Sequence, residues 1–157
     1  MRIISIDPGY ERLGIAVLER EKGGKEKLIF SECFKTSKNC PHEERLFFIG
    51  EEISKVIEKY KPSSLAIENL FINTNQKTAM RVAETRGVIL YEAKKHKLDV
   101  KEFTPPQIKL AVCGNGHADK KSIIKMVPLL IKITEKIEYD DEYDAIAVGL
   151  TFFAIVR

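Results

Sequence analysis

The most constraining feature of the sequence is a short apolar run near its start that ends abruptly in an acid. Residues Ile3 to Ile6 are apolar except for Ser5, a pattern typical of a strand buried on both faces. Asp7 closes the run, and the following Pro-Gly pair prevents the strand from continuing. We therefore predict a central strand with a carboxylate at its carboxyl end, where open sheets place ligands. Ordinary turn chemistry is the alternative explanation of an Asp-Pro-Gly sequence.

The periodicity of the remaining chain predicts one α/β domain spanning residues 1–157. Three strands, a helix, and then alternating strands and helices predict a five-stranded mixed sheet, with three antiparallel strands followed by parallel ones and with flanking helices. The expected strands end at Asp7 and cover Leu13 to Glu19, Lys27 to Phe34, Ser64 to Leu70 and Leu98 to Phe103; the expected helices cover residues 42 to 60, Lys77 to Lys97, a segment capped by Thr104 that runs to about Val112, a segment from Ala118 that breaks near Pro128, and Asp141 to Val156.

Composition narrows the classes of function. With 44% apolar and 31% charged residues the chain is globular, and its net charge of +3 permits a nucleic-acid partner through a local patch. The three cysteines lack the spacing of a zinc site or a disulfide framework, which fits a reducing cytoplasm. We expect no signal peptide, because the predicted strand at the N-terminus has no basic-then-apolar leader. We expect no membrane span, because the apolar run from Ala145 to Val156 is too short to cross a bilayer.

Four acids occupy positions that favour metal chemistry. Asp7 ends the first strand, and Glu68 interrupts an otherwise apolar strand. The other two acids, Asp141 and Asp144, form an Asp-x-x-Asp pair at the start of the last helix and share one helix face. Clustered carboxylates repel unless a cation neutralises them, and Mg²⁺ prefers oxygen ligands. Two such ions can activate a water for phosphodiester cleavage. A solvated acidic helix start is the alternative interpretation of residues 140–142.

Five stretches, spread over nearly the whole chain, carry a family resemblance: Ile6-Asp7-Pro8-Gly9, Ala66-Ile67-Glu68-Asn69-Leu70-Phe71, Arg86-Gly87-Val88, Gln107 to Lys120, and Asp141-Glu142-Tyr143-Asp144-Ala145-Ile146-Ala147. Their order and spacing resemble those of the RuvC family of Holliday-junction resolvases, which share the ribonuclease H-like fold. The resemblance implies a homodimeric, Mg²⁺-dependent endonuclease, with two ions in each site and Mn²⁺ as a substitute. The enzyme would nick two opposing strands of four-way junction DNA symmetrically and leave 5′-phosphate ends. The resemblance also implies a partner, a branch-migration helicase of the RuvA-RuvB type.

The resemblance also implies roles for individual residues. Asp7, Glu68, Asp141 and Asp144 match the catalytic, metal-binding carboxylates. Lys109 and Lys120 match basic residues near the scissile phosphate, although a solvated helix lysine is the simpler alternative. Phe71 matches an aromatic that stacks on unpaired bases at the junction centre, against the alternative of a core residue at a strand end.

Three details leave alternatives open. Asp140 is adjacent to Asp141, so a slip of one residue would change the third acid, although the Asp-x-x-Asp spacing favours Asp141. The segment Tyr10 to Leu13 departs from the family, which usually has small polar residues and a Thr where this chain has Leu13. Gly114 and Gly116 match a family glycine pair that approaches phosphate, but they fit a helix end equally well.

Two other functions remain as alternatives to the resolvase. Another ribonuclease H-like nuclease, cutting RNA–DNA hybrids or processing RNA, would use the same metal cluster. A junction-binding module without cleavage is the non-enzyme alternative, although all four acids are present. Actin-like kinases also begin with an Asp-x-Gly strand, but they need a much longer chain. For the dimer we predict that the helix Lys77 to Lys97 lies at the interface.

Overall fold

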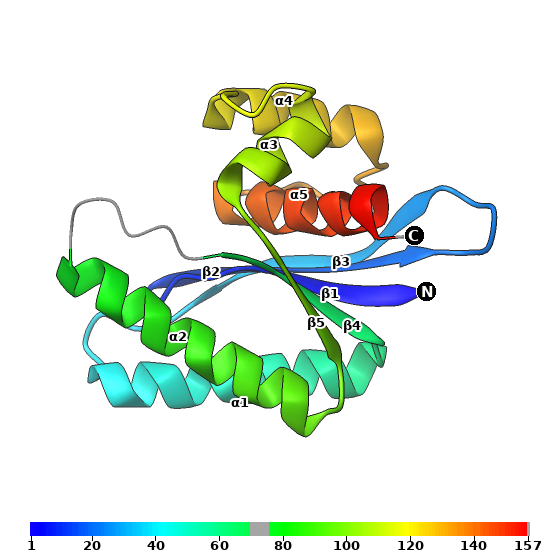
Figure 1. Ribbon diagram of the computed structural model, residues 1–157. Coiled ribbons are helices and arrows are strands. Elements are labelled where there is room, and N and C mark those ends of the chain that lie inside the picture. The colour runs from blue at the N-terminus through cyan, green and yellow to red at the C-terminus, as the bar shows by residue number, and fades with distance from the viewer. Residues whose placement is uncertain (70–75, 157) are drawn as a thin grey trace.

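Five strands form one mixed sheet in the computed structural model, which describes residues 1–69 and 76–156 (Figure 1). The central strand β1 pairs antiparallel with β2 and parallel with β4, so one sheet contains both kinds of ladder. This arrangement confirms the predicted α/β fold with a five-stranded mixed sheet. The strands are β1 (Arg2–Asp7), β2 (Arg12–Arg20), β3 (Glu26–Lys35), β4 (Ser64–Glu68) and β5 (Asp99–Phe103), in the spatial order β3-β2-β1-β4-β5.

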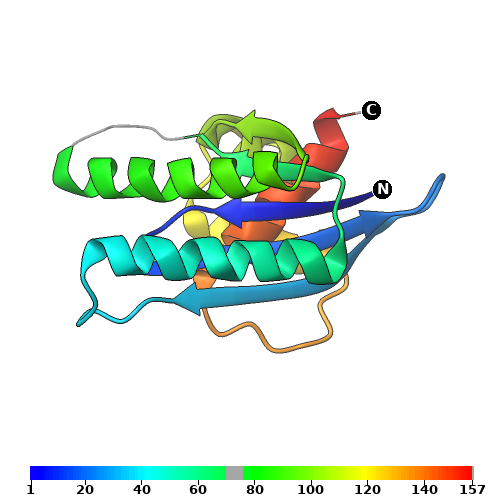
Figure 2. The same ribbon diagram turned by 90° about the horizontal axis from the view of Figure 1, so that it is seen from below.

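Helices cover both faces of the sheet, which explains the apolar character of β1 (Figures 1 and 2). One face carries α1 (His42–Tyr60) and α2 (Gln76–Lys95); the other carries α3 (Pro105–Cys113), α4 (Lys120–Leu130) and α5 (Asp140–Ile155). Alternate residues of β1 enter the two cores, with Ile4 and Ile6 on the α1 side and Ile3 on the α5 side. Among the described residues, no helix is both long and apolar enough to cross a bilayer.

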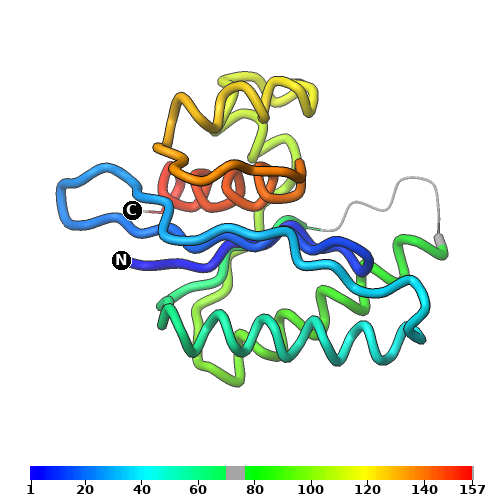
Figure 3. Tube along the Cα trace, turned by 180° about the vertical axis from the view of Figure 1, so that it is seen from behind, coloured from blue at the N-terminus to red at the C-terminus, as the bar shows by residue number. Residues whose placement is uncertain are grey.

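The helix α5 packs directly on the centre of the sheet because it has a glycine at the closest point. A Cβ atom at Gly149 would lie 2.7 Å from a Leu18 methyl and 2.8 Å from the Ser5 hydroxyl oxygen. The helix runs back across the sheet, with its first turn near the carboxyl end of β1 (Figures 1 and 3). The sheet and α5 therefore fix where the first turn of this helix lies.

Several predicted boundaries are wrong. The helix does not break near Pro128 but continues to Leu130, although the proline removes one i→i−4 hydrogen bond; buried Val127 packs this last turn against the core. That helix begins at Lys120 rather than Ala118, because the Asp119 carboxylate accepts a hydrogen bond from the Ser122 N–H at 2.8 Å. The helix predicted over Lys77 to Lys97 covers Gln76–Lys95, β4 ends at Glu68, and the last helix covers Asp140–Ile155.

Candidate active site

Two parallel strands bring the first two predicted acids together. Ile6 pairs with Ile67, so the next residues, Asp7 and Glu68, end adjacent strands at the same edge of the sheet. Because cross-strand neighbours face the same side, both acids follow the alternation that places Ile3 on the α5 face. An acid that ends one apolar strand and an acid within a second predicted strand therefore lie together, and the second strand ends at Glu68 rather than at Leu70.

The first turn of α5 adds two more acids. This turn approaches β2 at Gly14, where a Cβ atom would lie 2.0 Å from the Asp141 carbonyl oxygen. Gly14 is also the cross-strand partner of Asp7. Asp141 is consequently buried at the end of β1, and Asp144 follows one turn later on the same face of the helix.

The acids lie close enough to affect each other's ionisation. Burial raises the pKa of Asp7 well above its ordinary value, and the negative charges of Asp144, Glu68 and Asp141 raise it further. Burial and repulsion from Asp144 raise the pKa of Glu68 to about 7. Burial also raises the pKa of Asp144. The four predicted acids thus form one electrostatically coupled group with an excess of negative charge.

Both predicted basic residues lie beside this group. Lys109 and Lys120 line a cleft of about 190 Å³ together with Glu68 and Asp144, and both lysines lower the pKa of Glu68 against the effect of burial. The Lys120 ammonium bridges two carboxylates, at 2.7 Å from Asp140 Oδ2 and 2.9 Å from Asp144 Oδ2. Lys120 begins α4, so the positive end of that helix dipole adds to its charge at this point.

Asp140 and Asp141 both pair with Arg12 but differ in their other contacts. Among the causes of the raised pKa of Asp7 is Asp141, which lies within the acidic group. Asp140 instead accepts a hydrogen bond from Lys120, which lowers the pKa of Asp140. The structure therefore places Asp141 nearer to Asp7 than Asp140, and the assignment of Asp141 as the third site acid stays a prediction.

Sequence reasoning missed three side chains that hold the site together. Arg12 Nε lies 3.2 Å from Asp141 Oδ2, and the Cys33 thiol lies 3.8 Å from the same oxygen. Arg86 is buried, donates to the Glu68 carbonyl oxygen, and pairs with Glu102 at 2.6 Å. Arg86 lies in a stretch that matches the family, which was a signal for it. Arg12 lies in the segment that departs from the family, so the sequence offered no signal for its role.

Of three further residues that the sequence analysis singled out, the structure describes Leu13 and Gly114. Phe71 lies outside the described residues, so its position stays a prediction. Leu13 is buried in the core on the α1 side, so its side chain contributes to packing there. Gly114 adopts φ 70° and caps the end of α3, as the helix-end interpretation predicted.

The donor set fits a divalent cation by its chemistry. The group offers carboxylate oxygens, the ligands that Mg²⁺ prefers, and its excess negative charge calls for a cation. Over residues 1–69 and 76–156, no three metal-ligating side chains stand close enough together to surround one ion in the present arrangement. Lys120 contacts Asp144 Oδ2 at 2.9 Å, so an ion that used this oxygen would compete with the lysine for it.

Comparison with known proteins identifies the family. The model of the family described as crossover junction endodeoxyribonuclease RuvC matches residues 3–152. A protein of that name from Thermosipho melanesiensis is 44% identical over 149 residues, covering 95% of this chain and 94% of the relative. One from Fusobacterium nucleatum is 39% identical, covering 96% of this chain and 79% of the relative.

A solved structure has the same fold. The structure of Thermus thermophilus RuvC in complex with a Holliday junction substrate superposes with a TM-score of 0.91 at 30% identity, covering 100% of this chain and 95% of that chain. The five-stranded mixed sheet with its flanking helices is therefore the ribonuclease H-like fold of RuvC. By sequence and by fold, the chain belongs to the RuvC family of crossover junction endodeoxyribonucleases.

Proposed function

We propose that this chain resolves four-way DNA junctions by metal-dependent nicking of two opposing strands during recombination and repair. The observation that carries the proposal is the coupled group of Asp7, Glu68, Asp141 and Asp144 beside Lys109 and Lys120. The family supports this function, because its members are named crossover junction endodeoxyribonucleases and one structure contains a Holliday junction substrate. We also propose that residues 1–157 form one nuclease domain acting in the cytoplasm.

Asp7, Glu68, Asp141 and Asp144 are the proposed ligands of two Mg²⁺ ions, for which Mn²⁺ substitutes. Bound ions would activate a water and neutralise the charge that develops on the phosphate. The protein supplies the rigid positions: β1 and β4 hold two carboxylates, and α5 holds the other two. Arg12 holds Asp141, and Arg86 holds the end of β4 through the Glu68 carbonyl oxygen.

The basic residues position the DNA in this proposal. Lys109 and Lys120 lie at the cleft that contains Glu68 and Asp144, where an ammonium group can neutralise the scissile phosphate. Cleavage there leaves a 5′-phosphate and a 3′-hydroxyl. Phe71 is the proposed aromatic that stacks on an unpaired base at the junction centre.

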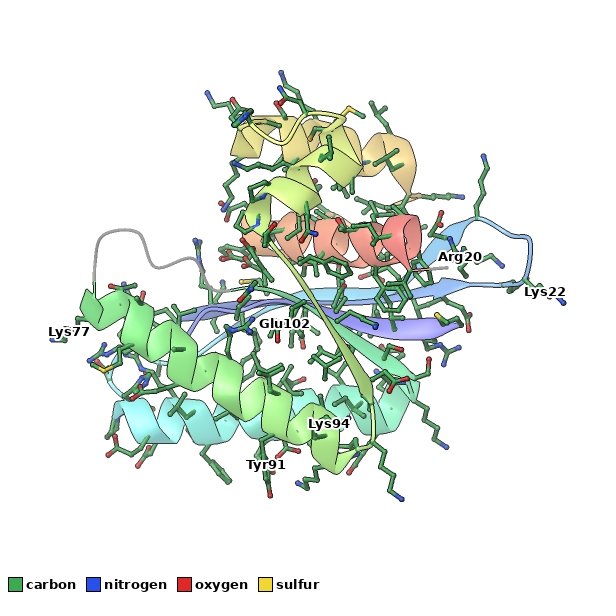
Figure 4. All side chains as sticks on the ribbon, viewed as in Figure 1. Arg20, Lys22, Lys77, Tyr91, Lys94 and Glu102 are labelled. Carbon is green, nitrogen blue, oxygen red and sulfur yellow. The ribbon has the colours of Figure 1, made fainter. Side chains whose placement is uncertain are left out.

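Nicking two opposing strands requires two active sites, and we propose that a homodimer supplies them. The outer face of the α1–α2 layer carries exposed apolar side chains that suit an interface. Tyr91 is 67% exposed and projects from α2 away from the sheet (Figure 4), and Met80 on the same helix is 62% exposed. Phe47 on α1 is 62% exposed. A RuvA-RuvB type helicase as further partner is an expectation from the family resemblance.

A cleavage assay with three substrates tests this function. Labelled four-way junction, linear duplex and RNA–DNA hybrid are incubated with the protein in Mg²⁺ and in EDTA. Paired symmetric nicks in the junction alone, abolished by EDTA, are expected. Preferential cutting of the hybrid would favour the other ribonuclease H-like activity, and tight junction binding without cutting in any divalent ion would favour the binding module.

A further inference from the structure

Asp140 has no role in the proposed metal site, yet it contacts two cations at its edge. Its Oδ2 atom lies 2.7 Å from the Lys120 ammonium, and its Oδ1 atom lies 3.7 Å from Arg12 Nη2. Lys120 comes from the start of α4 and Arg12 from the start of β2, so Asp140 joins two elements that are far apart in the sequence. Its side chain is 35% exposed, against 13% for Asp141.

Lys120 has two carboxylate partners that differ in what else they do. Asp144, at 2.9 Å, is a proposed metal ligand, whereas Asp140, at 2.7 Å, is not. An ion bound through Asp144 Oδ2 would take that oxygen from the lysine. The pair with Asp140 does not compete with the ion, so it persists when the pair with Asp144 is lost.

We propose that Asp140 is a positioning residue that keeps the Lys120 ammonium at the mouth of the active site after Asp144 has been given up to a metal ion. The inference rests on the proposed function, because it assumes that Asp144 is a ligand. A half-exposed lysine has four rotatable bonds and explores many positions when it has no partner. Asp140 removes that freedom and keeps the ammonium next to Asp144, at the cleft where we propose that the scissile phosphate binds.

Side-chain NMR tests the contact without any substrate. In protein labelled with ¹⁵N-lysine, a paired ammonium exchanges its hydrogens with water slowly and therefore gives a signal. The signal that is missing from the spectrum of the Lys120→Arg variant belongs to Lys120. We expect the parent to keep the Lys120 signal on saturation with Mg²⁺. The Asp140→Asn variant should keep it in EDTA and lose it in Mg²⁺. Loss of the signal from the parent in Mg²⁺, or its retention by Asp140→Asn, would overturn the proposal.

Junction cleavage gives the second readout. Misplacing a reacting group by about 1 Å can cost about 100-fold in rate, and we expect Asp140→Asn to lower the single-turnover rate at least about tenfold while junction affinity in EDTA stays within about twofold. Asp140→Glu should restore most of the rate. In a Lys120→Ala background, Asp140→Asn should have no further effect, because both changes remove the same function.

The matched control is Glu142→Gln. Glu142 is another acid of the first turn of α5 and bonds to the Ser31 hydroxyl at 2.9 Å, away from Lys120. If Glu142→Gln also cleaves slowly, the loss of rate reflects the stability of the helix and the positioning role is refuted. The same holds if Asp140→Asn lowers the cleavage rate equally in the parent and in the Lys120→Ala background. If calorimetry detects no Mg²⁺ binding to the parent, the metal site fails and this inference fails with it. If the parent binds Mg²⁺ and Asp140→Asn cleaves at the parental rate, the inference about Asp140 is refuted and the proposed function stands.

Discussion

Glu68 should destabilise the metal-free protein at neutral pH, and removing its charge should therefore stabilise it. Its pKa of about 7 in the folded chain stands against an ordinary value of 4.5. At about 1.4 kcal/mol for each pH unit, the ionised side chain costs the folded state about 3 kcal/mol. Glu68→Gln keeps the shape of the side chain and removes this cost.

The sign of the pH dependence follows from the raised pKa. Below about pH 4.5 the carboxyl group is protonated in both the folded and the unfolded chain, so it has no effect on stability. Between about pH 4.5 and 7 the unfolded chain loses the proton first, and the stability of the parent falls as the pH rises. Above about pH 7 the full penalty applies. Glu68→Gln should thus gain most over the parent at pH 8 and almost nothing at pH 4.

Thermal unfolding by circular dichroism in EDTA measures the difference. For a domain of about this length, 1 kcal/mol shifts Tm by about 2 to 4 °C, so Glu68→Gln should melt about 6 to 12 °C above the parent at pH 8. Saturating Mg²⁺ should stabilise the parent more than the variant, because a ligand raises the stability of the state that binds it. An equal or lower Tm for Glu68→Gln at pH 8 in EDTA, or a gain that is independent of pH, would refute the reasoning.

Two further predictions concern packing and assembly. Gly14→Ala should lose more than about 2 kcal/mol in unfolding free energy, because the new Cβ would lie 2.0 Å from the Asp141 carbonyl oxygen; Gly24→Ala, with its nearest contact at 3.5 Å, is the matched control, and equal melting of the two variants would contradict the close approach. Sedimentation at micromolar concentration should show that the parent is a dimer. The double variant Met80→Asp, Tyr91→Asp should dissociate this dimer, whereas the control Leu129→Asp should leave it intact, because Leu129 is exposed on the opposite helical layer. A monomeric parent would refute the interface.

Local sequence patterns were sufficient for the order of elements and for selecting four acids that lie close together, while the roles of these acids stay a prediction. Asp7 and Glu68 stand out because each ends an apolar strand, and the parallel pairing of β1 with β4 then places them together. The Asp-x-x-Asp spacing selected Asp141 because residues three apart share a helix face. In these cases a short-range sequence pattern selects the residues, and the pairing and packing of the elements then bring them together.

Contacts between distant segments were not predictable in the same way. Arg12 and Asp140 are ordinary surface charges in the sequence, and only the packing of α5 on β2 brings them together. The helix that continues past Pro128 is another tertiary effect, because buried Val127 keeps the last turn packed against the core. The role of Phe71 rests on the family resemblance alone and stays a prediction.

Cleavage by Asp7→Asn tests the central claim most directly. This substitution removes the charge of the acid at the end of β1 and preserves the size of its side chain. We expect the variant to bind a labelled four-way junction with parental affinity in EDTA and to produce no nicks in Mg²⁺, while the parent cuts two opposing strands symmetrically. Parental rates of nicking by Asp7→Asn would contradict the assignment of the four carboxylates as the metal-binding, catalytic group.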